Sequence, residues 1–115
     1  MSDDCLFCKI GAGKIPSKKV YEDDHTFAFH DIAPKAPTHI LVATREHYQA
    51  IHEIPLEKMD IVKQLFTAVS AIVKQEKLLD GGYRLVVNFG SQAGQSVPHI
   101  HVHILAGTTM SGDLV

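Results

Sequence analysis

The 115-residue sequence lacks tryptophan, contains only two cysteines and has few aromatic residues, 7% of the chain. It also has no apolar run near the roughly 20 residues that a membrane-spanning helix needs, so we expect no membrane partner. Positive charge is not in excess, because 11 lysines and arginines face 13 acidic residues for a formal charge of -2. The basic residues are scattered along the chain, which excludes a nucleic-acid partner bound through its phosphates.

The N-terminal segment "MSDDCLFCKIG" contains acids and no basic region followed by an apolar run. This pattern excludes a secretory signal, and we expect a cytoplasmic protein. In that reducing compartment the pair Cys5 and Cys8 favours metal binding or redox exchange over a structural disulfide. The length and the 45% hydrophobic content predict one globular domain, residues 1–115.

Hydrophobic periodicity predicts an α+β fold with a five-stranded antiparallel sheet, one long helix and a short N-terminal helix. The long helix is expected at 56–79, where apolar residues recur at intervals of three and four, and Gly81 and Gly82 are expected to end it. The short helix is expected at 5–12. The expected strands, the first two joined in a hairpin, are 19–23, 26–32, 39–45, 83–89 and 99–105.

The last of these strands, "HIHVHIL", places three histidines at alternate positions. Side chains two residues apart in a strand share a face at intervals of roughly 6.6 Å. The preceding loop, "GSQAGQSVP", offers backbone N–H groups and hydroxyls to an anion such as phosphate. Neutral imidazole attacks phosphorus, so the pattern favours phosphoryl or nucleotidyl transfer, although a metal site or a solvated face also fits three histidines. The chain has neither a P-loop nor a dinucleotide fingerprint, so we expect no organic cofactor.

These segments resemble the histidine-triad (HIT) superfamily. "HIHVHIL" fits its signature of histidines alternating with apolar residues. "HDIAPKAPTHILV" and "GYRLVVNFGSQAGQSVPHIHVHILAG" resemble its Hint branch, the nucleoside phosphoramidate hydrolases, and the similarity covers nearly the whole chain. The resemblance implies a HIT-like fold and a homodimer in which the long helix and "YRLVVNF" pack against a second copy.

The resemblance also implies an activity, hydrolysis of the P–N bond of purine nucleoside phosphoramidates through a covalent nucleotidyl-histidine that releases a nucleoside monophosphate. His101 matches the nucleophile that attacks the α-phosphorus, and His103 matches the triad member that contacts the phosphate. His39 matches a supporting histidine on a neighbouring strand, and a structural histidine of the core is the alternative. Ser96 matches the serine that hydrogen-bonds the phosphate or the leaving group.

The nucleotide-binding residues follow from the same resemblance. Asp31 matches the carboxylate that pairs with the ribose hydroxyls, Asn88 matches an amide beside the phosphate, and Gln95 is expected to contribute its backbone. Loop capping is the alternative role of Asn88 and Ser96, and core packing is the alternative for the apolar residues. An apolar sleeve favours purines with little discrimination between adenine and guanine. The residues matching this sleeve are Phe7, Ile10, Phe29, Ile32 and Leu41.

Two features depart from the closest pattern. The tail "TTMSGDLV" lacks the aromatic and proline residues that often reach the active site, so the leaving group is open. "CLFC" matches half of a zinc site found in other superfamily members, which implies a structural zinc ion on Cys5, Cys8, His47 and His99; two free thiols are the alternative.

Several functions remain open beside the phosphoramidase. They are dinucleoside polyphosphate hydrolysis, nucleotidyl transfer, and a nucleotide-binding regulatory role. A catalytic metal held by all three triad histidines is least favoured, because alternate strand positions lie far apart for one tetrahedral ion.

Overall fold

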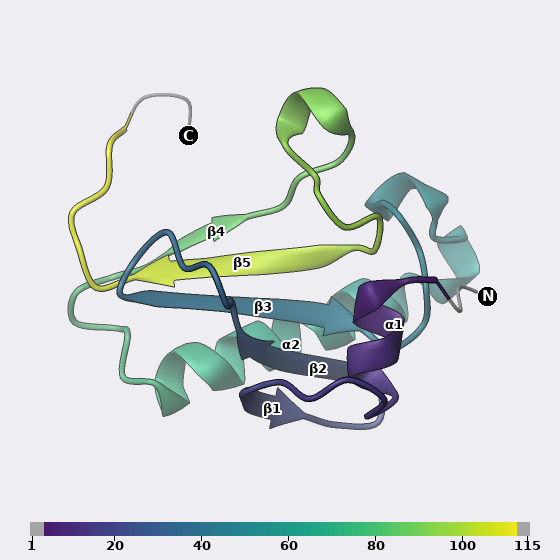
Figure 1. The fold of residues 1–115 in the computed structure, drawn as a ribbon, viewed down its shortest axis with the longest axis horizontal. Helices are drawn as coiled ribbons and strands as arrows, with labels where there is room; N and C mark the ends of the chain where they lie inside the picture. Colours follow the sequence, from purple (N-terminus) through teal and green to yellow (C-terminus); the bar gives the residue numbers. More distant parts are fainter. Residues whose placement is uncertain (1–3, 113–115) are drawn as a thin grey trace.

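The computed structural model describes residues 4–112 and has the expected architecture (Figure 1). Five antiparallel strands form one sheet in the order β1-β2-β3-β5-β4, and β1 and β2 form the expected hairpin. Three 3-10 turns lie in the connections: η1 (Ile51–Glu53), η2 (Leu56–Lys58) and η3 (Ser91–Ala93). The helices and strands are α1 (Leu6–Gly11), β1 (Lys19–Glu22), β2 (Thr26–His30), β3 (Thr38–Thr44), α2 (Asp60–Gln75), β4 (Arg84–Val86) and β5 (His101–Ala106).

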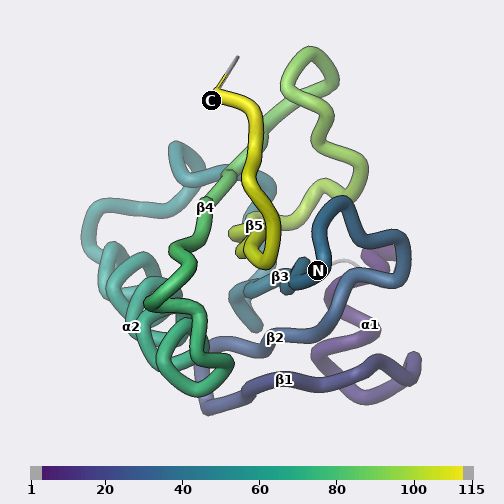
Figure 2. The backbone as a smooth tube through the Cα atoms, turned by 90° about the vertical axis from the view of Figure 1, so that its left-hand side faces the viewer, coloured from purple at the N-terminus to yellow at the C-terminus, as the bar shows by residue number. Residues whose placement is uncertain are grey.

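The two helices lie on opposite faces of the sheet (Figure 2). Strand side chains alternate between faces, so even-numbered residues of β3 and β5 pack against α2. Odd-numbered residues of the same strands face the α1 side. The core under α2 includes Ala28, Ile40, Val42, Val102, Ile104, Leu65, Val69 and Ile72. The cluster under α1 contains Cys5, Phe7, Phe27, Phe29, Leu41 and Ala43. The predicted separation of apolar and histidine faces in 99–105 is therefore confirmed for β5.

The long helix is shorter at both ends than the predicted range 56–79. Residues 56–58 form η2 after Pro55, and Leu56 is 83% exposed instead of lying in the core. At the other end Lys77 adopts φ 60°, and the Leu78 N–H donates to the Val73 carbonyl at 2.9 Å. A left-handed residue after the helix, with this return bond, ends α2 before Gly81 and Gly82 are reached.

The last two strands are also shorter than predicted. β4 covers three residues of the predicted 83–89, and β5 begins at His101 instead of His99. The His99 N–H donates to the Val97 carbonyl at 2.8 Å, which bends the chain just before β5 starts. His99, the first histidine of the triad, therefore lies just before the start of β5. Its side chain can contact residues other than those that surround His101 and His103.

Residues 1–3 and 113–115, on which the predicted N-terminal and C-terminal features partly rest, lie outside the described residues. Within 4–112, no helix combines the length and the apolar character that crossing a membrane would require.

Candidate active site and metal centre

The central histidines lie side by side on the α1 face of the sheet. His101 and His103 of β5 pair with Ala43 and Leu41 of β3. The rings of His101 and His103 are 4.9 Å apart between centroids, and His39 of β3 lies 5.2 Å from His103. The structure therefore brings together the three histidines for which the sequence predicts a catalytic role.

His101 is buried, and its ring is held on two sides. Nδ1 lies 2.6 Å from the His99 carbonyl oxygen, and the Phe7 ring meets the imidazole edge-on at 4.8 Å. A carbonyl accepts only, so the neutral ring carries its proton on Nδ1 and has a lone pair on Nε2. Burial lowers the pKa of His101, which favours the neutral ring. Nε2 of the neutral ring is therefore available as a nucleophile.

His39 and His103 are joined by a hydrogen bond of 2.9 Å between His39 Nε2 and His103 Nδ1. Asp31 lies beside them, with Oδ2 3.5 Å from His39 Nε2. Burial is the largest influence on both rings: it lowers the pKa of His39 and lowers that of His103 to about 4. Both imidazoles are thus neutral near pH 7 in the free protein.

The loop between β4 and β5 is tied to its surroundings by Gln95. The side chain of Gln95 accepts from the Gly90 N–H at 3.2 Å and donates to the Gln49 carbonyl at 3.0 Å. Its own N–H donates to the Gly90 carbonyl at 3.1 Å. Ser96 follows as an exposed residue, and Asn88 at the start of the loop is half-buried. Gln95 therefore fixes the shape of the loop that carries Ser96.

The predicted base sleeve divides into buried and open residues. Phe7, Phe29 and Leu41 are all buried in the cluster under α1, where Phe7 meets Phe29 edge-on at 5.4 Å. Ile10 is half-buried against that cluster, whereas Ile32 is 99% exposed. Phe7, Phe29 and Leu41 therefore form the buried apolar layer on the α1 face of the sheet, and Ile32 lies at the edge of that face.

An open cavity of about 800 Å³ extends along this edge. Asp31, Ile32 and His39 lie in its wall, with His30 and Lys18 beside them. The Asp31 carboxylate is partly exposed, and Oδ1 accepts the Ala33 N–H at 2.8 Å. The cavity is large enough for a nucleoside, whose usual binding sites are clefts of about 300–1,000 Å³.

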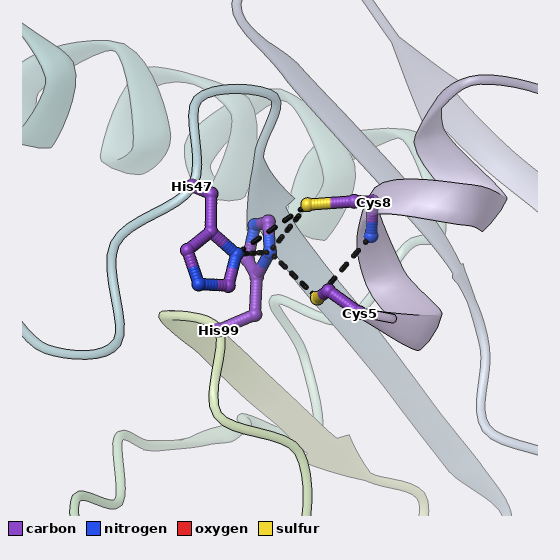
Figure 3. A group of neighbouring side chains, drawn as sticks. All are labelled: Cys5, Cys8, His47 and His99. Carbon is purple, nitrogen blue, oxygen red and sulfur yellow. Dashed lines mark hydrogen bonds between the residues drawn. The ribbon is translucent and has the colours of Figure 1, made fainter. Parts of the chain in front are cut away.

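A second group, Cys5, Cys8, His47 and His99, converges beside the triad (Figure 3). Cys5 caps the N-terminus of α1, where its sulfur accepts the Cys8 N–H at 3.5 Å, and His47 lies in the connection after β3. His99 is fully buried, and Nε2 lies 2.7 Å from the Thr44 carbonyl. The ring therefore carries its proton on Nε2 and turns the Nδ1 lone pair toward the sulfurs.

These four side chains fit a tetrahedral metal ion. Sulfur and nitrogen ligands of zinc lie about 3.5 Å apart, and two nitrogens about 3.3 Å apart, given the usual bond lengths. The structure has Nδ1 of His99 at 3.4 Å from Cys5 Sγ and 3.6 Å from Cys8 Sγ. His47 Nδ1 lies 3.4 Å from Cys8 Sγ and 3.2 Å from His99 Nδ1. The Thr44 carbonyl is the kind of outer partner that orients a metal-binding histidine.

The ionisation of the cluster also depends on its burial. Burial, together with the neighbouring Cys5, raises the pKa of the Cys8 thiol to about 11. Burial lowers the pKa of His99 to about 4, which leaves a neutral imidazole as a donor. Because metal ligands bind as thiolate and neutral imidazole, a cation would release protons from the thiols.

The triad histidines do not form a single metal site within residues 4–112. The two groups there that could hold an ion are the Cys5 group and Asp31 with His39 and His103. Neither of these two groups contains all three triad histidines. The arrangement therefore does not favour a catalytic metal ion held by His99, His101 and His103.

Sequence reasoning missed Arg45, which joins the N-terminal helix to the sheet. Its guanidinium donates to the carbonyls of Gly11 and Asp23 at 2.8 Å each and lies 5.7 Å from the centre of the Phe27 ring. It also pairs with Glu22 at 3.2 Å. A lone arginine at the end of a predicted strand carries no signal for this role.

Comparison with known proteins identifies the family of this chain. Residues 12–110 match the model of the HIT domain family. The purine nucleoside phosphoramidase of Escherichia coli K12 is 38% identical over 107 residues, 93% of this chain and 90% of that protein. A HIT-like protein of Synechococcus elongatus is 42% identical over 111 residues, 96% of each chain.

Solved structures agree with this match. A histidine triad protein from Clostridium difficile has a TM-score of 0.92 at 46% identity, with 96% of each chain covered. A HIT family hydrolase from Legionella pneumophila has a TM-score of 0.91 at 39% identity, covering 96% of this chain and 98% of that one.

Proposed function

The chain belongs to the HIT domain family, and we propose that it hydrolyses the P–N bond of purine nucleoside phosphoramidates. One relative carries the name purine nucleoside phosphoramidase and shares 38% of its residues over most of both chains. The observation that carries the proposal is the arrangement of His101, whose Nδ1 lies 2.6 Å from the His99 carbonyl. This arrangement supports a nucleophilic Nε2, since the free lone pair lies on that nitrogen.

The proposed reaction has two displacement steps at the α-phosphorus. His101 Nε2 attacks phosphorus, the P–N bond breaks, and the leaving amine takes up a proton from solvent. Water then attacks the nucleotidyl-histidine, the bond between Nε2 and phosphorus breaks, one proton of the water returns to solvent, and nucleoside monophosphate leaves. His103, 4.9 Å from His101 between ring centroids, is positioned to donate to a phosphate oxygen as negative charge develops. His39 supports His103 through the bond of 2.9 Å.

The nucleoside would occupy the cavity of about 800 Å³ beside the triad. Asp31 lies in its wall and offers carboxylate oxygens to the ribose hydroxyls. Ile32 lines this cavity, whereas Phe7, Phe29 and Leu41 are buried on the α1 face with Ile10 half-buried beside them, and we propose that these residues supply the apolar surface for the base. We assign Ser96, Asn88 and Gln95, which lie in the segment between β4 and β5, to the phosphate side.

A panel of substrates tests the proposal. The ratio kcat/KM is compared for adenosine phosphoramidates, guanosine phosphoramidates and dinucleoside polyphosphates. We expect a clear preference for the P–N bond and similar values for the two purines. Preferential cleavage of dinucleoside polyphosphates would assign the chain to the other hydrolase activity, and nucleotide binding without turnover would indicate a regulatory role.

We also propose that Cys5, Cys8, His47 and His99 bind one structural zinc ion. When bound, the ion cross-links α1 to the sheet, and four protein ligands leave no open position for substrate. Elemental analysis of protein prepared without chelator is expected to find one zinc per chain. A metal-free sample that does not take up added zinc would contradict this assignment.

A homodimer is the third part of the proposal. β4 pairs with β5 along one side only, and the neighbouring residues Tyr83, Leu85 and Val87 are 43%, 37% and 49% exposed. On α2, Phe66 is also 41% exposed. An edge strand with apolar side chains favours pairing with another copy, which would extend the sheet across two chains.

A further inference from the structure

We infer that the backbone N–H of Lys35 is a positioning group for the triad, because it fixes which nitrogen of His39 carries the proton. This N–H lies 3.0 Å from His39 Nδ1 and donates to it. A backbone amide cannot accept a hydrogen bond through its N–H, so Nδ1 must offer a lone pair. The neutral His39 ring therefore carries its proton on Nε2.

Asp31 favours the same tautomer from the other side of the ring. Its Oδ2 lies 3.5 Å from His39 Nε2 and attracts a hydrogen on that nitrogen. His39 is buried, with 5% of its surface exposed, so the ring has few alternative partners in water. Two groups with opposite hydrogen-bonding character, a donor at Nδ1 and an acceptor near Nε2, thus specify one tautomer.

The tautomer of His39 also determines the tautomer of His103. His39 Nε2 carries hydrogen, so the bond of 2.9 Å runs from this nitrogen to His103 Nδ1. His103 Nδ1 accepts, and the neutral ring of His103 carries its proton on Nε2. His101 has the opposite arrangement, with the proton on Nδ1 facing the His99 carbonyl. Neighbouring rings on β5 therefore present a lone pair and an N–H donor, which are the two groups that attack on phosphorus and charge stabilisation require.

The loop that carries Lys35 is anchored at several points. The Asp31 N–H donates to the His39 carbonyl at 2.9 Å, which closes the base of the loop. At the end of β5, Gly107 has φ +97°, and a Cβ there would lie 2.9 Å from Pro37 Cβ. The Lys35 side chain is exposed and its charge only adds to the effect of burial in lowering the pKa of His39, whereas the backbone N–H contacts the ring directly, so we assign the positioning role to the backbone. These contacts hold the loop on either side of Lys35, which favours a fixed position for its N–H, as a group that orients a catalytic side chain requires.

The tautomers can be measured in the wild-type protein without substrate. In a sample labelled with ¹⁵N at histidine, long-range proton–nitrogen correlation spectra show which ring nitrogen of each histidine is protonated. We expect the proton on Nε2 in His39 and His103 and on Nδ1 in His101. A proton on Nδ1 of His39 would overturn the inference, whether or not any variant folds.

A pair of variants separates the N–H from the side chain. Lys35→Pro removes the N–H together with the ammonium group, whereas Lys35→Ala removes only the side chain. Relative to Lys35→Ala, we expect Lys35→Pro to lower kcat about 10–100-fold, the usual cost of losing an orienting partner, with little change in KM. The ¹⁵N spectrum of Lys35→Pro should show loss of the single His39 tautomer. Equal kcat and identical spectra for the two variants would contradict the positioning role.

The consequence for catalysis rests on the proposed function, and the two can fail separately. A wild-type protein that shows the expected tautomers but cleaves no phosphoramidate would refute the proposed function and leave the His39 assignment standing. A wild-type protein that cleaves phosphoramidates with the other His39 tautomer would refute the inference alone.

Discussion

Acid should destabilise the fold partly through His103, and the size of the effect follows from its surroundings. Burial lowers the pKa of His103 to about 4 from an ordinary value of 6.5. His101 and His39 lower it further when charged, while Asp31 acts in the opposite direction. Between these two pKa values the unfolded chain binds a proton that the folded chain does not, so stability falls as pH falls from 6.5 toward 4.

The magnitude at pH 5 is about 2 kcal/mol if the full shift applies, because each pKa unit corresponds to about 1.4 kcal/mol over the range where only the unfolded chain is protonated. Partial contact of the ring with water reduces this, so we expect about 1–2 kcal/mol. Urea unfolding at pH 7 and pH 5 gives the loss of stability for the wild type and for His103→Gln. His103→Gln should lose less stability than the wild type between the two pH values.

His25→Gln provides the matched control, since His25 is exposed in the turn between β1 and β2. This variant should lose stability between pH 7 and pH 5 to the same extent as the wild type. Equal losses of stability in His103→Gln and the wild type would refute the conclusion that the buried His103 makes stability depend on pH.

Three further outcomes are expected. His101→Ala should abolish turnover but retain nucleotide binding, measured by calorimetry, because Asp31 and the buried apolar layer remain; near-normal turnover by the folded variant would refute its role as nucleophile. Cys8→Ser should lower the zinc content of protein prepared without chelator and reduce its melting temperature, whereas unchanged zinc content would exclude Cys8 as a ligand. Leu85→Glu should shift the mass measured by sedimentation at micromolar concentration from two chains to one, since it places a charge on the exposed edge strand; a wild-type mass of one chain would exclude a stable dimer.

The alternation in the triad strand made much of the fold predictable. A period of two fixes which side chains share a face, so Val102 and Ile104 could be assigned to the core and His101 and His103 to the opposite side. The end of α2 could not be predicted in this way. Lys77 takes a left-handed conformation that is uncommon for residues other than glycine, so the sequence predicts a helix that continues almost to the next glycine pair.

The candidate site also contains features that the sequence pattern predicts and features that only the fold reveals. The side chains in the histidine row have a visible spacing, and Cys5 with Cys8 forms a recognisable local pair. His99 approaches that pair because the chain bends before β5, a feature that the alternating sequence does not contain. The Thr44 carbonyl and the Lys35 N–H are backbone groups, present at nearly every residue, so only the folded arrangement distinguishes them.

The interleaving of core and reactive residues along β5 also determines which genetic changes this segment tolerates. Exchanges of one aliphatic residue for another of similar volume at Val102 or Ile104 keep the parity of the strand and disturb only the local packing. Loss of a single codon between His101 and Ala106 reverses that parity, which turns an imidazole into the space under α2 and an isoleucine to the α1 face. This strand therefore tolerates conservative substitutions but not the insertion or deletion of a single residue. Differences in length among relatives should occur in the connecting loops instead.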